Sequence, residues 1–260
     1  MVFGGRTQDG PTNLIHALRP DFAPNPETLP VPLYGHCIVF DKHSTKVYII
    51  GGYHGRVDEN IGISSDVWLM DYSKIPAETV LLNSLRTPRM EHMCGLIVET
   101  ENEVDQCKII VAGGFDGTNS LDSIEIFETS NDYNQWRYSK SSLNQALHGG
   151  AMVSDSTLTT LDYDLAIIGG KSIGRGFSNK VTHLTWNSAE NDIDVKDHEN
   201  TLNYVRADFA LIDHSTTICP PNPTTSKPTV PTEAPTEALT EAPTNAPTNA
   251  PTDPITSQVP

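Results

Sequence analysis

Three side chains have the types and spacing of a metal site. Glu190, Asp194 and His198 follow one another at intervals of four residues, and carboxylates with an imidazole suit ferrous iron. The surrounding segment is dense in Asp and Glu. If residues 192–196 form an outer strand, Glu190 and Asp194 need not converge with His198. A chance match is the favoured interpretation, and no metal or other cofactor is expected.

The four cysteines offer little further chemistry. They lack the C-x-x-C spacing of a zinc site. A bridge between Cys94 and Cys107 has poor geometry, because pairing of their two segments brings Cys94 closer to Val111. Cys37 and Cys94 fall on successive inner strands, where buried thiols and a disulfide both remain open; the fourth cysteine is Cys219. No nucleophile-elbow, phosphate-loop or zinc-protease motif occurs, so no catalytic residue is assigned.

The elements that would position such side chains are repeated. Short apolar runs end in four glycine doublets, which are separated by 47, 62 and 56 residues. These intervals scatter around the length of a four-stranded propeller blade, and runs rich in Ile, Val and Tyr that end in glycine predict buried strands. The doublets are Gly4 and Gly5, Gly51 and Gly52, Gly113 and Gly114, and Gly169 and Gly170.

Further strands are predicted around each doublet. Upstream runs begin at His36, His92 and His148, and these histidines are expected to share one structural role in successive repeats. Downstream strands are predicted at residues 66–72, 123–127 and 179–186. A fourth strand is clearest at 135–138, and the last is predicted at 206–212.

The best repeat resembles a kelch blade. It contains residues 92–98, 109–114, the loop beginning Phe115-Asp-Gly, residues 124–127 and then Trp136, in the order of that family. The resemblance implies an all-β fold of kelch-type β-propeller blades over residues 1–219, forming an incomplete or small propeller. A truncated larger protein is favoured over closure of a four-bladed ring, because both ends hold partial blades.

Residues 220–260 form a second region. Threonine recurs every fourth residue from Thr232 to Thr256, mostly after proline, and this composition predicts a disordered, extended spacer. Such stretches resemble O-glycosylated stalks. An extracellular or cell-surface location is therefore expected, although the chain shows no signal peptide and a cytoplasmic location remains the alternative.

Charge narrows the range of partners. The formal net charge is −16, of which the tail carries −3 through four acidic residues and one lysine, so −13 falls on residues 1–219. Such a body repels phosphate backbones and anionic lipid. No apolar run is long enough for a membrane span. Neither nucleic-acid binding nor membrane insertion is expected.

The prediction for function is a binding module for a protein or glycan ligand, with no enzymatic activity assigned. The loops that follow three doublets, at 53–65, 115–121 and 171–178, should gather on one face and carry recognition. The alternatives are a propeller enzyme, either similar to galactose oxidase or of the iron-dependent specifier type, and a structural spacer in an extracellular matrix. The candidate contact residues are Arg56, Asp58, Phe115, Asp116, Arg175 and Phe177.

Overall fold

The computed structural model describes residues 1–16, 24–41, 44–55, 62–101, 104–129, 135–154 and 163–208. Met1–Thr217 form one compact unit and Ile218–Pro260 a second, and every described residue belongs to the first. The described residues form strands and turns without a helix, so none of their segments is a helix that could cross a membrane. The predicted strand near 206–212 is absent from residues 206–208, and the rest of it lies outside the described residues.

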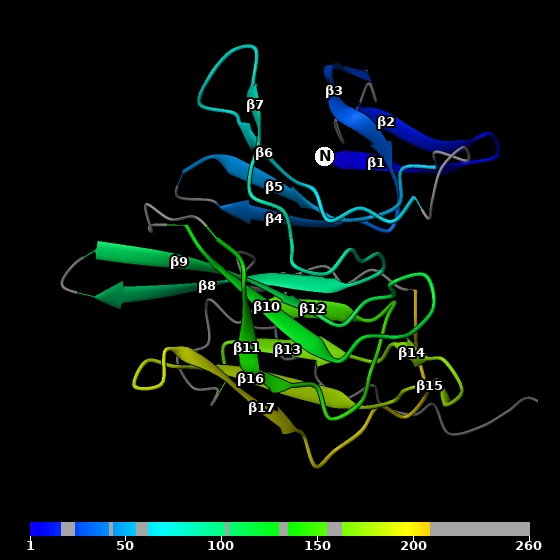
Figure 1. Cartoon of the computed structure of the whole chain (residues 1–260), viewed down its shortest axis with the longest axis vertical. Coiled ribbons are helices and arrows are strands. Elements are labelled where there is room, and N and C mark those ends of the chain that lie inside the picture. Colours follow the sequence, from blue (N-terminus) through cyan, green and yellow to red (C-terminus); the bar gives the residue numbers. More distant parts are fainter. Residues whose placement is uncertain are drawn as a thin grey trace, which may run out of the picture. The chain divides into compact units, whose positions relative to one another are not determined.

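Antiparallel sheets make up the whole described unit (Figure 1). The first sheet holds β1 (Val2–Thr7), β2 (Gly10–His16) and β3 (Pro24–Leu33). The second holds β4 (Cys37–Asp41), β5 (Lys46–Ile50), β6 (Val67–Asp71) and β7 (Glu78–Leu81). The third holds β8 (Met93–Glu101), β9 (Val104–Ala112), β10 (Ser123–Glu128) and β11 (Arg137–Ser142). The fourth holds β12 (Ala151–Ser154), β13 (Leu165–Ile168), β16 (Val181–Asn187) and β17 (Asp192–Asp197), and a separate ribbon holds β14 (Lys171–Ser172) and β15 (Gly176–Phe177).

Strand order explains the sequence pattern. Each four-stranded sheet follows chain order from one edge to the other, and its second strand directly precedes its glycine doublet. Gly4 and Gly5 instead lie within β1, an edge strand of the three-stranded sheet. Ile109–Ala112 of β9 are completely buried because strands flank them on both sides and neighbouring sheets cover both faces. By contrast, the edge strand β11 alternates exposed and half-buried side chains. The predicted all-β, blade-like architecture is confirmed.

Neighbouring sheets pack through three apolar clusters. One cluster joins the first sheet to the second through residues such as Ile15 and Ile49. The next joins the second sheet to the third, with Tyr48 near Phe127 and Trp136. The last joins the third to the fourth. Trp136 precedes β11 rather than lying in it, so the predicted fourth strand at 135–138 begins two residues too early.

A disulfide ties two of these sheets together. Cys37 of β4 is bonded to Cys94 of β8, with the two Cα atoms 6.1 Å apart, which decides between the alternatives that the sequence left open. Cys94 pairs with Val111 in the β8–β9 register, as predicted, and Cys107 is a buried thiol.

A buried ion pair holds the third sheet to the segment before it. Arg89 and Glu125 both have completely buried side chains, and Nη2 of Arg89 lies 2.6 Å from Oε1 of Glu125. The same guanidinium donates to the carbonyls of Gly113 and Ser123. Backbone N–H groups of Arg86 and Thr87 donate to the carboxylate. Almost every polar atom of the pair is thereby satisfied, as a buried charge requires.

The starts of the inner strands are linked by main-chain hydrogen bonds. The N–H of Glu91 donates to Gly35, that of Gly149 donates to Glu91, and that of Asp208 donates to Gly149, each at 2.7 Å. All four residues have left-handed backbone, with φ between 52° and 64°. One repeated geometry therefore spaces the sheets.

This series of hydrogen bonds, called the ladder below with Gly35, Glu91, Gly149 and Asp208 as its rungs, shows that the three histidines do not occupy equivalent positions. His36 and His92 each directly follow a rung of the ladder, whereas His148 directly precedes the rung at Gly149. His148 instead forms a β-bridge with Lys171, in the way that Tyr34 does with Tyr53. The expectation of one shared role for three histidines is wrong, because glycine occupies position 150, where the first two repeats have histidine.

The glycine doublets fulfil a geometric requirement. Gly51 has φ of 57°, and a Cβ atom there would lie 2.6 Å from the carbonyl oxygen of Arg89. Gly113 and Gly169 have nearly the same φ. Glycine is favoured at these positions because it adopts left-handed backbone readily and because it has no Cβ atom to clash with the neighbouring main chain.

Candidate functional site

The loops after the last two doublets lie side by side. The N–H of Ile173 donates to Oγ of Ser120 at 2.9 Å. The backbone of His148 pairs with that of Lys171 through two hydrogen bonds of 2.8 and 2.9 Å. The predicted gathering of loops 115–121 and 171–178 is thus observed. Of the third loop, residues 56–61 lie outside the described residues.

A polar cavity of about 320 Å³ opens between these loops and the segment that follows β11. Its walls carry amide, hydroxyl, carboxylate and guanidinium groups, which can donate and accept hydrogen bonds in many directions. Arg175 is exposed. The lining includes Asn119, Ser120, Asp122, Asn144, Gln145 and Arg175.

The candidate contact residues occupy different surroundings. Arg175 lines the cavity, and Phe177 on β15 is 60 % exposed. Phe115 is half-buried, with its ring 5.5 Å from that of His148. Oδ1 of Asp116 accepts the N–H groups of Thr118 and Asn119, so this side chain shapes its own loop. Arg56 and Asp58 lie outside the described residues.

A charged cluster borders the cavity. Nζ of Lys171 lies 3.2 Å from Oε2 of Glu91 and 2.8 Å from Oδ2 of Asp208. Burial lowers the pKa of Lys171, but the two carboxylates outweigh it and raise the pKa above its ordinary value. Burial dominates at His148 and lowers its pKa, while Glu91 acts in the opposite direction. Lys171 is therefore a fixed cation, and His148 is neutral at pH 7.

The carboxylate–histidine set of the sequence does not form a common site. Glu190 pairs with Lys140 at 3.1 Å, and Asp194 accepts a hydrogen bond from Asn187. His198 instead contacts the backbone of Asn200. In the described ranges, no three His, Cys, Asp or Glu side chains are grouped to hold a metal ion.

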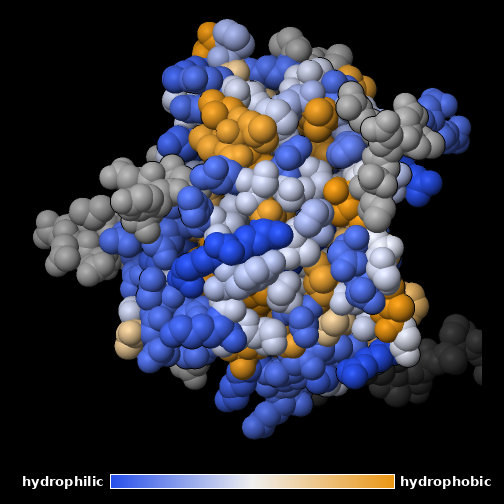
Figure 2. Space-filling view, viewed as in Figure 1, coloured by the Kyte–Doolittle hydropathy of each residue, from blue (hydrophilic) through white to orange (hydrophobic). Residues whose placement is uncertain are grey.

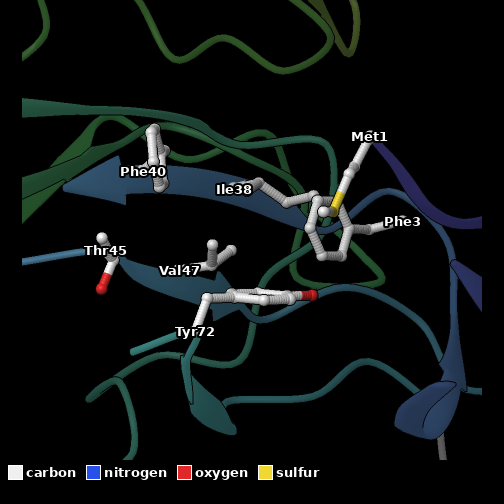
Figure 3. A pocket seen from close by; sticks show the side chains of 7 residues that line it. All are labelled: Met1, Phe3, Ile38, Phe40, Thr45, Val47 and Tyr72. Atoms are coloured by element: carbon white, nitrogen blue, oxygen red, sulfur yellow. The ribbon is translucent and has the colours of Figure 1, made fainter. Parts of the chain in front are cut away.

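A second hollow is apolar and lies beside β1, β4 and β5 (Figure 3). It has a volume of about 540 Å³ and is lined by Met1, Phe3, Ile38, Phe40 and Tyr72, among others. Figure 2 shows hydrophobic side chains gathered in the upper part of the view and a largely hydrophilic surface elsewhere. This hollow offers few polar groups for recognition.

Sequence reasoning missed several residues of the polar site. Asn144 and Gln145 belong to the link between the third and fourth sheets, outside the three loops that were predicted to carry recognition. Glu91 and Lys171 meet only because the inner strands start close together. The order of the strands held one signal for these residues. Each link between sheets must return to the end of the sheet where the next inner strand starts, and this brings the link close to the loops after the doublets.

Comparison with known proteins agrees with the architecture. The family model described as the kelch motif matches residues 102–140. The solved structure of YjhT is 17 % identical with a TM-score of 0.54, over 71 % of this chain and 52 % of that one. The chain thus spans about half the length of that protein, and this likeness concerns the fold alone. No curated protein matches the chain by sequence. Residues 102–140 thus match the kelch motif, and the four-stranded antiparallel sheets agree with blades of the kelch type.

Proposed function

We propose that the chain is a protein-binding module whose recognition site is the polar cavity between loops 115–121 and 171–178. The observation that carries this proposal is the convergence of Arg175, Gln145 and Asn119 on one cavity from three separate segments. A guanidinium recognises a carboxylate through paired hydrogen bonds, and amides bind a peptide backbone. A protein loop with an Asp or Glu side chain is the ligand that fits this lining.

A panning experiment tests the proposal. The 260-residue chain is biotinylated and exposed to a phage-displayed random peptide library, and the enriched peptides are synthesised for affinity measurement. We expect acidic side chains among them, and affinities at least tenfold weaker for Arg175→Ala, which loses a charged hydrogen bond. Arg6→Ala, which removes an exposed guanidinium from the first sheet, is the matched control. Equal affinity for the wild type and Arg175→Ala would refute the site.

We also propose that the chain is part of a secreted or cell-surface protein. The Cys37–Cys94 bond supports this proposal, because structural disulfides persist mainly in oxidising compartments. The test is alkylation of the protein, isolated from secretory and from cytosolic expression, with and without reductant. Secreted protein should protect both cysteines until it is reduced. Alkylation of Cys37 in secreted, unreduced protein would count against the proposal.

The enzyme alternatives from the sequence remain open to a direct test. Oxidase-like chemistry predicts bound copper, and specifier-like chemistry predicts bound iron. Elemental analysis of purified protein measures either one. Stoichiometric iron that is lost in Glu190→Ala would favour the specifier alternative over a binding module.

A further inference from the structure

His148 is distinguished from the other histidines by its surroundings. It lies at the start of the fourth sheet's inner strand, with only 8 % of its surface exposed. Its ring is held against Phe115, and its backbone is paired with Lys171. The imidazole is therefore fixed in orientation beside the polar cavity.

A serine and a carboxylate face opposite nitrogens of this ring. Oγ of Ser120 lies 3.0 Å from Nδ1, and Oε2 of Glu91 lies 4.0 Å from Nε2. The N–H of Ile173 donates to Oγ of Ser120, which leaves the hydroxyl proton to be donated to Nδ1. A neutral ring with its proton on Nε2 accepts the serine proton at Nδ1 and keeps its N–H on the side of the ring where Glu91 lies.

Glu91 occupies a costly backbone position. Its φ is 52°, whereas glycine is present at the equivalent positions 35 and 149 and aspartate at 208. Left-handed backbone is unfavourable for a residue with a side chain. Nζ of Lys171 lies 3.2 Å from the carboxylate oxygen of Glu91 that faces the ring. The ion pair with Lys171 therefore holds the side chain of Glu91 behind His148.

Ser120 is accessible from the cavity. It is one of the lining residues, together with Asn119, Gln145 and Arg175. The side chains of these three neighbours are hydrogen-bond donors that a negatively charged oxygen requires. A cavity of about 320 Å³ accommodates a small acyl group with a polar alcohol.

We propose that Ser120, His148 and Glu91 form an acyl-transfer centre that hydrolyses short-chain carboxylic esters of polar alcohols. Ser120 is the nucleophile, His148 the general base and Glu91 a positioning residue. The set has the roles of a Ser-His-carboxylate triad, with the two ring nitrogens exchanged. This activity is separate from peptide binding but uses one wall of the same cavity.

Each step balances. Oγ of Ser120 forms a bond to the ester carbonyl carbon while its proton moves to Nδ1 of His148. The carbon–alkoxide bond then breaks, and the alcohol departs with that proton, leaving acyl-Ser120. Water adds to the acyl carbon and gives a proton to Nδ1. Cleavage of the bond to Oγ releases the carboxylic acid as the proton returns to Ser120.

The test measures covalent reactivity and turnover on the full chain. A fluorophosphonate probe should label one residue, identified as Ser120 by mass spectrometry of the digested protein, and p-nitrophenyl acetate should be hydrolysed. We expect Ser120→Ala to abolish labelling and His148→Gln to lower the hydrolysis rate at least 100-fold. Ser73→Ala, in a turn of the second sheet, is the control and should keep both activities.

The dependence of the hydrolysis rate on pH distinguishes a positioning role of Glu91 from a purely structural one. The rate should rise as His148 loses its proton, and Glu91→Gln should move that rise to lower pH because Glu91 raises the pKa of His148. Labelling at another residue, or hydrolysis unchanged in Ser120→Ala, would overturn the proposal. Peptide affinity of the same variants reports on the binding module separately, so the two proposals fail independently.

Discussion

Replacing Arg89 with methionine provides the sharpest test of how the blades are held together. The change removes all five hydrogen bonds of the guanidinium, including those to Gly113, Ser123 and Glu125. Methionine keeps much of the aliphatic volume but leaves the carboxylate of Glu125 buried without its cation. Breaking a buried pair in this way costs about 3–5 kcal/mol.

The structure places the expected loss near the lower end of that range. Glu125 retains two backbone donors, Arg86 and Thr87, at 2.7 and 3.1 Å, so part of its charge remains solvated by the protein. We expect Arg89→Met to lose about 3 kcal/mol of unfolding free energy. Arg89→Met combined with Glu125→Leu should be less destabilised than the single variant, because no unpaired charge remains.

Urea unfolding followed by tryptophan fluorescence measures these values. Lys140→Met is the control, since Lys140 and its partner Glu190 are both exposed and lie 3.1 Å apart; its loss should stay below about 1 kcal/mol. If Arg89→Met lost no more than Lys140→Met, the conclusion that the buried pair joins the third sheet to the preceding segment would be refuted.

Three further predictions concern the stability of the folded chain. Burial lowers the pKa of His36 to about 4 and that of His92 to about 3, so stability is full above pH 6.5 and falls at lower pH. Between pH 7 and 5 the loss is about 2 kcal/mol for each histidine, and a flat urea midpoint across that range would contradict it. Replacing Cys37 with serine removes a disulfide whose cysteines are 57 residues apart in the sequence; it should cost about 4 kcal/mol, and a urea midpoint equal to that of the wild type would contradict this value. Gly113→Ala should lower the melting temperature, since the new Cβ would meet the carbonyl of Leu147; an unchanged temperature would reject that contact.

The strands were predictable because their signal is local. Three of the glycine doublets follow runs rich in Ile or Val, and Ile109–Ala112 show the continuous burial that such a run indicates. The error at His148 has a physical cause: it lies two residues before position 150, which is equivalent to His36 and His92, and a histidine followed by Gly-Gly resembles one that starts a strand. Spacing alone does not reveal which backbone atoms are bonded.

The sequence predicted the general location of the candidate site but few of the residues that form it. Loop positions after the doublets led to Arg175, which lines the cavity, whereas Gln145 and Glu91 approach from other repeats. Contacts between repeats depend on the angle between sheets, and main-chain hydrogen bonds set that angle. The angle between sheets leaves no pattern in the sequence of residue types, so the contacts of His148 could not be predicted from the sequence.

The hydrogen-bonded ladder of left-handed residues has a consequence for how such a chain can change. Since peptide groups at Gly35, Glu91, Gly149 and Asp208 define the distance from one sheet to the next, the side chains of the connecting loops contribute little to that spacing. New loop sequences can then be exchanged on a scaffold that keeps its dimensions, and specificity can diversify without a matching redesign of the framework.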